Sequence, residues 1–400
     1  MTTHGHGMRT RRCSQSKLLS HLDGILHTAS ASVPPTCNLE QNRAVGDKSL
    51  EMDELKIFDY QLPRELIAQQ PLPVRSSARL LIIDREREEI RHASIMDLPE
   101  ILRAGDLLVA NDSRVLPARL MGRRVSTGGR WEGLFLSVEE STGLWCLLAH
   151  SRGRLGIGER VVLLDRSGVD AYEIELIAKK DGGIWQARAI TTLAATEVLL
   201  QVGRVPLPGY IRRGIADAAD HDRYQTIFAR HDGSAAAPTA GLHFTPELID
   251  SLLVRGITTA SVTLHVGVDT FRPISVERIE DHPMHCEWGN CPEKTSTAVR
   301  HCRRSGGRVV AIGTTAVRVL ETAAISGEIE PWKGTTRLFI RPGFQFRSVD
   351  CLLTNFHLPR TTLLLLVAAL AGSDLLQRAY QEAIIEEYRF LSYGDAMLVL

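Results

Sequence analysis

Apolar residues along this chain gather into short runs separated by polar and glycine-containing turns. From residue 53 to about 117 these runs are mixed in type. Leu80–Asp84 and Leu107–Ala110 predict short buried strands, whereas Pro63–Gln69 and Asp97–Arg103 predict short helices. Proline at the first position of one helix and Gly105 just beyond the other are the expected boundary residues. This part of the chain therefore has α/β character.

The pattern changes between residues 118 and 208, where short apolar stretches recur with glycine-containing breaks between them. The stretches are Trp131–Val138, Leu144–Ala149, Arg160–Leu164, Tyr172–Ala178 and Ile184–Ala189. Strands with this close spacing are typical of an antiparallel barrel or sandwich. We expect residues 118–208 to form an inserted domain.

From about residue 209, predicted strands and helices alternate again. The expected strands are Ile257–Val266, Arg308–Ile312, Leu338–Ile340 and Leu352–Thr354. The expected helices are Pro246–Arg255, Ala316–Ala324, Thr361–Ala371 and Asp374–Tyr388. Such alternation favours a mixed, largely parallel sheet with flanking helices. Residues 53–117 and 209–400 are therefore expected to form one discontinuous α/β domain.

The first 51 residues lack this regular patterning. Arg11 and Arg12 are not followed by an apolar segment, so neither a secretory nor a twin-arginine signal is supported. Two hypotheses remain: a disordered extension, or a start codon assigned too early, with Met52 as the true first residue. Regular patterning begins directly after Met52, and mass spectrometry of the native N-terminus distinguishes the two hypotheses.

The overall charge argues against an obvious nucleic-acid partner, because 47 basic residues balance 47 acidic ones. Only seven of the basic residues are lysine, and arginine offers a planar fork for phosphates and carboxylates. A GC-rich genome explains the same bias. The longest apolar run, Leu363–Ala371, is far shorter than the roughly 20 residues of a membrane helix. We expect a monomeric protein without a membrane segment.

The seven cysteines are odd in number, which favours free thiols in a reducing cytoplasm. The densest group of potential metal ligands is His282, His285, Cys286, Cys291, His301 and Cys302. This group has no CxxC pair, and its spacings match structural zinc sites poorly. We therefore predict buried or surface thiols and no metal.

Two histidines stand in positions that suit chemistry. Residues Gly233–Thr245 begin with a string of small residues, which let a ligand approach the backbone closely, and His243 follows it just before a predicted helix. His265 lies at the end of a predicted strand, where open α/β sheets bind ligands. For each histidine, an ordinary structural role is the alternative interpretation.

Three further polar segments follow predicted strands. They are Asn111–Arg114, Gly313–Thr315 with Arg318 one turn into the next helix, and Thr354–Pro359. The second segment opens a helix, whose N-terminus favours anions, although it contains neither a Walker loop nor GxGxxG. A plain polar turn is the alternative for each. We expect all five segments to meet in one cleft. No GxSxG, HExxH or DxDxDG string supports those hydrolase or metal chemistries.

Charge is unevenly distributed in spite of the neutral total. Nine basic residues face three acidic ones between Val299 and Ser348, whereas five acids face two arginines in Ser373–Leu400. A neutral protein can therefore carry a local basic face. A scatter of solvated surface charges is the alternative interpretation.

Together these strings identify a family. The sequence resembles the S-adenosylmethionine:tRNA ribosyltransferase-isomerase family of queuosine biosynthesis. The matching segments are Phe58–Ala68, Asn111–Arg119, Pro206–Ile211, Gly233–Thr245, Thr263–Gly267, Asn355–Pro359 and Ser392–Met397. The resemblance covers nearly everything after residue 52, and the string Gly233–Thr245 is its most specific part.

The resemblance implies an α/β domain with an inserted antiparallel β-barrel. It also implies that S-adenosylmethionine, as a co-substrate, donates its ribosyl part to a 7-aminomethyl-7-deazaguanine base at the tRNA wobble position. The product is epoxyqueuosine tRNA, adenine and methionine leave, and no metal or redox cofactor is implied. The chain departs from the family pattern at Asp269, at residues 149–154 and at Thr336-Arg337, which bears on local substrate contacts.

Residue type, placement and motif together suggest roles. The sulfonium makes the adjacent 5′ carbon acidic, so a base can start the reaction, and histidine titrates in the required range. We predict His243 or His265 as the base or acid, with Asp112 assisting. The predicted substrate-binding residues are Arg114, Thr239, Gly241, Thr314, Thr315, Arg318, Asn355 and His357.

The modified base lies in an anticodon loop, where it can be splayed out of the stack. We expect the basic stretch 299–348 to face the tRNA. The predicted tRNA-binding residues are Arg303, Arg304, Arg337, Arg341 and Arg347. Two alternatives remain: a methyltransferase-like enzyme, which would release S-adenosylhomocysteine, and an RNA-binding barrel protein without activity.

Overall fold

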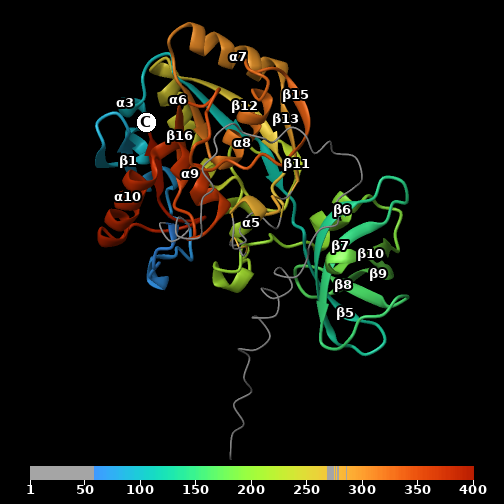
Figure 1. The fold of residues 1–400 in the computed structure, drawn as a ribbon. Coiled ribbons are helices and arrows are strands. Elements are labelled where there is room, and N and C mark those ends of the chain that lie inside the picture. Colours follow the sequence, from blue (N-terminus) through green and yellow to red (C-terminus); the bar gives the residue numbers. More distant parts are fainter. Residues whose placement is uncertain (1–57, 268–273, 275, 277–278, 285) are drawn as a thin grey trace, which may run out of the picture.

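A computed structural model describes residues 58–267, 274, 276, 279–284 and 286–400. Figure 1 shows a large body, in which a sheet is covered by helices, and a smaller body of strands β5–β10 beside it. The predicted extension 1–51, the alternative start at Met52 and the unusual Asp269 lie outside the described residues.

The large body is built on a nine-stranded sheet with the order β15-β13-β12-β3-β14-β16-β17-β1-β2. Its strands are β1 (Arg79–Asp84), β2 (Glu89–Ser94), β3 (Leu107–Asn111), β12 (Thr258–Leu264), β13 (Glu287–Cys291), β14 (Val309–Ile312), β15 (Trp332–Thr336), β16 (Cys351–Asn355) and β17 (Ala396–Val399). Strands β12, β3, β14 and β16 run parallel at the centre, and β17 is parallel to β1. Antiparallel pairs complete the sheet toward both edges. The predicted α/β class with a mixed sheet is confirmed.

The apolar runs form central strands because both faces of the sheet are covered. On β14, Val309 and Ala311 belong to the core on one face, and Val310 and Ile312 belong to the core on the other. The first core is closed by helices α7 (Glu293–Arg304), α8 (Thr314–Ala323), α9 (Thr362–Ala371) and α10 (Ser373–Ile385). The second is closed by α3 (Leu98–Ile101) and α6 (Pro246–Val254), which begins at its predicted N-cap Thr245.

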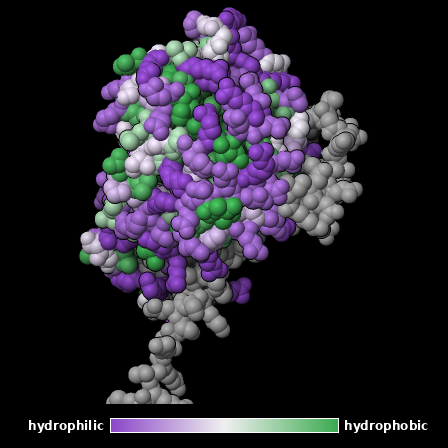
Figure 2. Space-filling view, turned by 90° about the vertical axis from the view of Figure 1, so that its left-hand side faces the viewer, coloured by the Kyte–Doolittle hydropathy of each residue, from purple (hydrophilic) through white to green (hydrophobic). Residues whose placement is uncertain are grey.

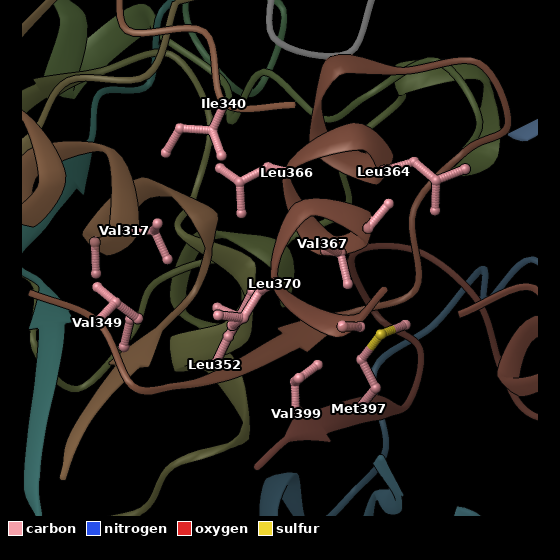
Figure 3. Close-up of a cluster of buried hydrophobic side chains, with 14 of the residues drawn as sticks. Val317, Ile340, Val349, Leu352, Leu364, Leu366, Val367, Leu370, Met397 and Val399 are labelled. Carbon is pink, nitrogen blue, oxygen red and sulfur yellow. The ribbon is translucent and has the colours of Figure 1, made fainter. Parts of the chain in front are cut away.

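Helix α9 is apolar on nearly all sides because it is buried in the first core. Figure 3 shows Leu366, Val367 and Leu370 of α9 in one cluster with Leu352 of β16 and Met397 of β17. Within the described part of the chain, no single helix has both the length and the apolar character needed to cross a membrane. Helices α9 and α10 reach that length together, with a bend of 114° between them.

The smaller body is a closed barrel with the strand order β10-β7-β6-β5-β8-β9. Its strands are β5 (Arg119–Arg124), β6 (Arg130–Val138), β7 (Trp145–Ser151), β8 (Arg160–Leu164), β9 (Asp170–Lys179) and β10 (Ile184–Ala189), and helix α4 (Ala195–Val202) packs into the same core. Trp131 fills this core against Gly133, where a Cβ atom would lie 2.2 Å from the indole ring. All strand pairs are antiparallel, so the predicted antiparallel β-barrel is confirmed.

One predicted strand is wrong. Leu338–Ile340 lies outside the ladders, and the strand of this region is β15, earlier in the chain. Both Leu338 and Ile340 are buried, so their apolar character reports burial and not strand pairing. Strand β5 is absent from the sequence-based assignment because its stretch is rich in arginine and lacks an apolar run.

The ends of the central strands place the polar segments together. Parallel strands point their carboxyl ends to one edge of a sheet, and here β3, β12, β14 and β16 end at Asn111, Leu264, Ile312 and Asn355. The polar segments singled out in the sequence follow directly after these residues. A short two-stranded sheet, β4 (Ser113–Val115) with β11 (His231–Ser234), brings the loop before α6 to the same edge.

Candidate active site

A cleft of about 610 Å³, including the space at its open mouth, lies at this carboxyl edge. Its walls come from the loop before α6, the first turn of α8, the segment between β16 and α9, and residues near 210 and 391. Five of the predicted substrate-binding residues line it. They are Thr239, Thr314, Thr315, Asn355 and His357.

The side-chain amide of Asn355 has a hydrogen-bonded nitrogen and an oxygen without a partner among the described residues. Its Nδ2 donates to His243 Nε2 at 3.1 Å, to the Leu391 carbonyl at 3.2 Å and to the Asp395 carbonyl at 3.4 Å. Its Oδ1 is buried and has no partner among the described residues. The two backbone carbonyls beside Nδ2 can only accept, so they exclude the flipped amide. An unpaired buried acceptor in a cleft wall indicates a donor on a ligand.

His243 lies behind Asn355 and lines a smaller neighbouring pocket. Its side chain is buried, and burial, followed by the charges of Arg389 and Arg75, lowers its pKa to about 4. The ring is therefore neutral near pH 7, and its Nε2 accepts the Asn355 hydrogen bond. Within the described structure, the clearest effect of His243 is to orient Asn355.

The first turn of α8 forms another wall of the cleft. Gly313 joins β14 to this helix with a φ of 88°, a conformation that favours glycine. Thr315 Oγ1 is buried and without a partner among the described residues. The first N–H groups of a helix have no intrahelical acceptors and favour negative charge. This wall therefore suits the carboxylate of a small ligand.

His357 is the third histidine at the cleft. Its Nε2 lies 2.9 Å from Thr354 Oγ1, and its backbone N–H donates to Tyr380 Oη at 2.9 Å. Burial lowers its pKa to about 3, so the ring stays neutral across the physiological range. The contacts hold this ring firmly in place in the wall.

A second polar group lies beside the cleft, at the ends of β3 and β12. His265 Nδ1 is 2.8 Å from Ser113 Oγ, and the ring stacks on Trp288 with 5.0 Å between centroids. Thr263 Oγ1 donates to Asp112 Oδ1 at 2.7 Å. Burial is the main cause that lowers the pKa of His265, and the ring is only half-buried. His265 is thus a neutral, partly accessible base with a hydroxyl on one nitrogen.

Asp112 also faces a histidine that the sequence did not single out. Its Oδ2 lies 3.8 Å from His231 Nε2, and its backbone oxygen accepts the His231 N–H. Arg114, two residues on, forms an exposed ion pair with Asp232 at 3.6 Å. Arg114 therefore sits beside this second group and does not line the cleft.

The small-residue loop joins the two groups. Gly233, with a φ of 146°, lies against His265, where an added Cβ would be 2.8 Å from the ring. Ser234 Oγ then accepts the Val266 N–H at 3.0 Å, and Ala237–Ala240 line the cleft. The loop runs between His265 and the cleft, where larger side chains would collide with the ring or fill the cleft. Its small residues avoid both.

Besides Arg114, two further predicted substrate-binding residues are placed outside the cleft. Arg318 forms a buried ion pair with Glu287 of β13 and donates to the Leu338 carbonyl, so it ties α8 to the outer strands. Gly241 backs onto Thr226, where an added Cβ would meet the methyl group at 3.0 Å. The structure does not bring either residue into the cleft.

The predicted tRNA-binding arginines are divided between two edges of the sheet, and their role in tRNA binding stays a prediction. Arg303 pairs with Asp350 and Arg304 with Glu328, and Arg347 donates to carbonyls at the end of α8. The partners of these arginines lie just before β16 or just after α8, which places them at the sheet edge opposite the cleft. Arg337 and Arg341 follow β15, which ends at the cleft edge next to Glu287. The five arginines are close together in the sequence. Helix α7 and strand β15 end at opposite edges of the sheet, so the arginines near these two ends are separated in space.

Several site residues were missed as chemical candidates. Tyr210 and Ser392 line the cleft with 2.7 Å between their hydroxyl oxygens. Both lie in strings that carried the family resemblance, which was the available signal. Arg75 and Arg223 line the pocket behind His243, and the charge of Arg389 acts on His243. Nothing in their local sequence marks these three arginines.

The described residues hold no group of three or more His, Cys, Asp or Glu side chains that could bind a metal ion. His285, part of the His/Cys cluster noted in the sequence, lies outside them. The expectation of a metal-free enzyme stays a prediction.

Comparison with known proteins places these features in a family. A family model described as "Queuosine biosynthesis protein" matches residues 55–399. An S-adenosylmethionine:tRNA ribosyltransferase-isomerase of Geobacter sulfurreducens is 50% identical over 348 residues, which are 86% of this chain and 98% of that protein. One of Geobacter metallireducens is 48% identical over 344 residues, with coverage of 86% and 98%. The crystal structure of an S-adenosylmethionine tRNA ribosyltransferase from Thermotoga maritima is 35% identical, covers 86% of this chain and 100% of its own, and has a TM-score of 0.49.

Proposed function

The chain belongs to the queuosine biosynthesis family of S-adenosylmethionine:tRNA ribosyltransferase-isomerases, and we propose how its cleft serves that reaction. The enzyme transfers the ribosyl part of S-adenosylmethionine to the 7-aminomethyl-7-deazaguanine base at the tRNA wobble position and isomerises it. Epoxyqueuosine tRNA forms, and adenine and methionine leave. The observation that carries the assignment of the site is the pair of unpartnered buried atoms, Asn355 Oδ1 and Thr315 Oγ1, in residues that line one cleft.

The cleft is proposed to hold the donor. Asn355 Oδ1 accepts from an N–H group of S-adenosylmethionine, because it is the buried acceptor that lacks a partner. The first turn of α8, with Thr314 and Thr315, binds the methionine carboxylate through free N–H and hydroxyl groups. Thr239 and His357 shape the remaining walls.

His265 is proposed as the general base. The sulfonium acidifies the 5′ carbon of the ribose, and a proton passes from this carbon to a ring nitrogen of His265. The ring is neutral because its pKa is lowered, and Ser113 holds Nδ1. Asp112 lies close enough to favour the charged ring, since its charge raises the His265 pKa. His243 is the weaker candidate because its Nε2 is occupied by Asn355.

The assay that tests the reaction uses S-adenosylmethionine labelled in the ribose and tRNA that carries the deazaguanine precursor. The expected result is equal release of adenine and methionine, with the label retained in the tRNA. Release of S-adenosylhomocysteine would indicate a methyltransferase. A donor that is not consumed would indicate an RNA-binding protein without activity.

Two matched variants test the assignment of the base. His265→Gln should lower kcat by about 100-fold or more, the usual contribution of a general base. His243→Gln, which keeps an acceptor for Asn355, should retain most of the turnover. The reverse result would move the base role to His243, and near wild-type turnover in both variants would exclude both histidines.

We also propose that the enzyme is a monomer that works in the cytoplasm without a metal or redox cofactor. The face in Figure 2 supports the first point, since its hydrophobic residues lie in small groups among hydrophilic ones. Light scattering after gel filtration checks the mass, cell fractionation checks the location, and turnover in the presence of a chelator checks the requirement for metal.

A further inference from the structure

A second pocket, of about 310 Å³, lies next to the cleft. It shares Ser392 with the cleft, and His243 lies in its wall with its Nε2 bonded to Asn355 of the cleft. Arg75 and Arg223 also line it. The pocket is therefore separated from the donor site only by a shared wall.

The arginines of this pocket are held by backbone carbonyls. Arg75 donates to the Gln225 carbonyl at 2.6 Å and to the Asp222 carbonyl at 2.9 Å. In return, Arg223 donates to the Pro73 carbonyl at 3.1 Å and to the Leu72 carbonyl. Carbonyl groups orient a guanidinium but do not neutralise it. Both cations are thus fixed in position with their charge retained.

Arg389 adds a third cation. It donates to the Gln70 carbonyl, next to the pocket residue Pro71, while its NH1 group is buried without a partner in the described structure. Within the described part of the chain, no carboxylate forms an ion pair within 4 Å with any of the three arginines. The buried Asp395 carboxylate accepts the Arg389 backbone N–H at 2.8 Å, so its charge offsets part of that of Arg389. The Asp222 side chain, which faces this region, is 93% exposed and is screened by solvent.

Arg75 and Arg223 repel each other, and the charges of Arg389 and Arg75 both act on His243. Burial, followed by the charge of Arg223, lowers the pKa of Arg75. Burial, Arg389 and Arg75 lower the pKa of His243. Burial and mutual repulsion make the charged forms of these side chains unfavourable. A bound anion would offset that cost, so the pocket should favour anion binding. Guanidinium groups bind phosphate in particular, through paired N–H donors.

We propose that Arg75, Arg223 and Arg389 bind a backbone phosphate of the tRNA anticodon loop beside the donor cleft. This inference rests on the proposed function, because a wobble base that enters the cleft brings its flanking phosphates to the cleft rim. A phosphate fits better than the methionine carboxylate of the donor. The carboxylate is already served by the first turn of α8, on a different wall.

The variants that test the site are Arg223→Gln and Arg389→Gln. The matched control is Arg255→Gln, at the end of α6 and at the opposite sheet edge, where Arg255 forms an exposed ion pair with Glu100. Affinity for the precursor tRNA is measured over a range of salt concentrations. Each site variant should bind about 5- to 10-fold more weakly, and the slope of log K against log salt should fall by about 0.7–0.9 for each lost phosphate contact. The control should leave affinity and slope nearly unchanged, and KM for S-adenosylmethionine should stay constant in all variants.

A complementary test leaves the protein intact. Phosphates of the anticodon loop are replaced one at a time by neutral methylphosphonates, and binding to wild-type enzyme is measured. One position near the wobble nucleotide should weaken binding to wild type but not further weaken binding to Arg389→Gln. This test remains informative even if an arginine variant fails to fold.

Two results would overturn the proposal. One is an unchanged tRNA affinity and salt slope in folded variants, together with no sensitive phosphate. The other is a higher KM for S-adenosylmethionine with unchanged tRNA affinity, which would assign the pocket to the donor carboxylate. Adenine release by the wild-type enzyme is measured separately, so failure of this site leaves the proposed reaction standing.

Discussion

Asn355 shows how a single side chain acquires its function from its neighbours. An asparagine carries both donors and an acceptor, and nothing in its local sequence says which end meets a ligand. The carbonyls of Leu391 and Asp395 and the ring of His243 take the donor end. The acceptor is therefore left for the cleft. This makes His243 a positioning residue whose protonation would break the arrangement.

Protonation of His243 also couples stability to pH. Its folded pKa of about 4 lies below the usual 6.5, so the folded protein resists a proton that the unfolded chain accepts. Stability from this residue is complete above pH 6.5 and is lost as the pH falls toward 4, with a total of about 3 kcal/mol. His243→Gln should remove this dependence.

The measurement is the free energy of unfolding in urea at about pH 7.5 and about pH 5. Between these values the wild type should lose about 2 kcal/mol more than His243→Gln, because of the proton taken up by the unfolded chain. An equal loss in both proteins would show that folding does not lower the pKa of His243, so that the folded protein also takes up this proton by about pH 5. The other histidines whose pKa is lowered, His265 and His357, are present in both proteins and cancel.

At the scale of elements, the loop before α6 has a spatial purpose that its composition only hinted at. It passes from His265 at Gly233, along the cleft at Ala237–Ala240, to His243. The short strand β11 brings the start of the loop to the carboxyl edge of the sheet, and Asn355 at the end of β16 holds His243 at its other end. The lack of bulky side chains keeps both the histidine and the ligand space in place.

Gly233→Ala should therefore impair catalysis through geometry. The φ of 146° is strained for alanine, and the new Cβ would lie 2.8 Å from the His265 ring. We expect the ring to be displaced and kcat to fall by about 10-fold or more, since small misplacements of a catalytic group are costly. Steady-state kinetics with donor and precursor tRNA measure the effect.

Gly306→Ala is the matched control for backbone strain. Its φ is 77°, and no atom lies within 4 Å of the added Cβ. It should lower stability by about 1–3 kcal/mol without a change in kcat. If both variants lose turnover to the same extent, strain and not contact with His265 would be the cause.

At the scale of the whole molecule, the barrel and the α/β body have separate cores. The barrel core contains Trp131, Trp145 and Trp185, and it shares no residue with the two cores that flank the large sheet. The two bodies are connected by segments on either side of the bridge between Arg119 and Arg204. A substitution in one core is therefore expected to lower mainly the stability of the body that contains it.

Trp131→Ala tests this independence. Loss of this buried ring should destabilise the barrel by about 3–5 kcal/mol, the usual cost of an emptied aromatic site. Calorimetry should then show an earlier transition for the barrel, while binding of S-adenosylmethionine persists to the higher transition. A single transition that abolishes donor binding would show that the bodies unfold as one unit.

Much of the architecture followed from local patterns. Apolar runs such as that of β3 identify strands that are buried on both faces, and Thr245 with Pro246 identifies the start of α6. The glycine-punctuated stretches after residue 118 identify the barrel. Strand β5 was missed because its outward arginines hide the alternation, and Leu338–Ile340 was misassigned because burial alone resembles a strand.

The site was only partly predictable. The polar segments at strand ends could be found because parallel strands end at one edge, and five of the predicted substrate residues do line the cleft. Arg318 was misleading because its partner Glu287 lies on a distant strand. The basic stretch is split in space, because a helix and a strand carry neighbours in sequence to opposite edges of the sheet, and its role toward tRNA stays a prediction.

The sequence by itself determined most of the elements, the two kinds of domain and the family, since these depend on residue type, spacing and motif. Only the tertiary structure decided which atoms meet: the free oxygen of Asn355, the Ser113–His265 contact, and the arginine pocket behind His243. The contacts Asn355–His243, Ser113–His265 and Arg75–Gln225 each join residues more than 100 positions apart. Their formation depends on strand order and packing, which no local pattern in the chain encodes.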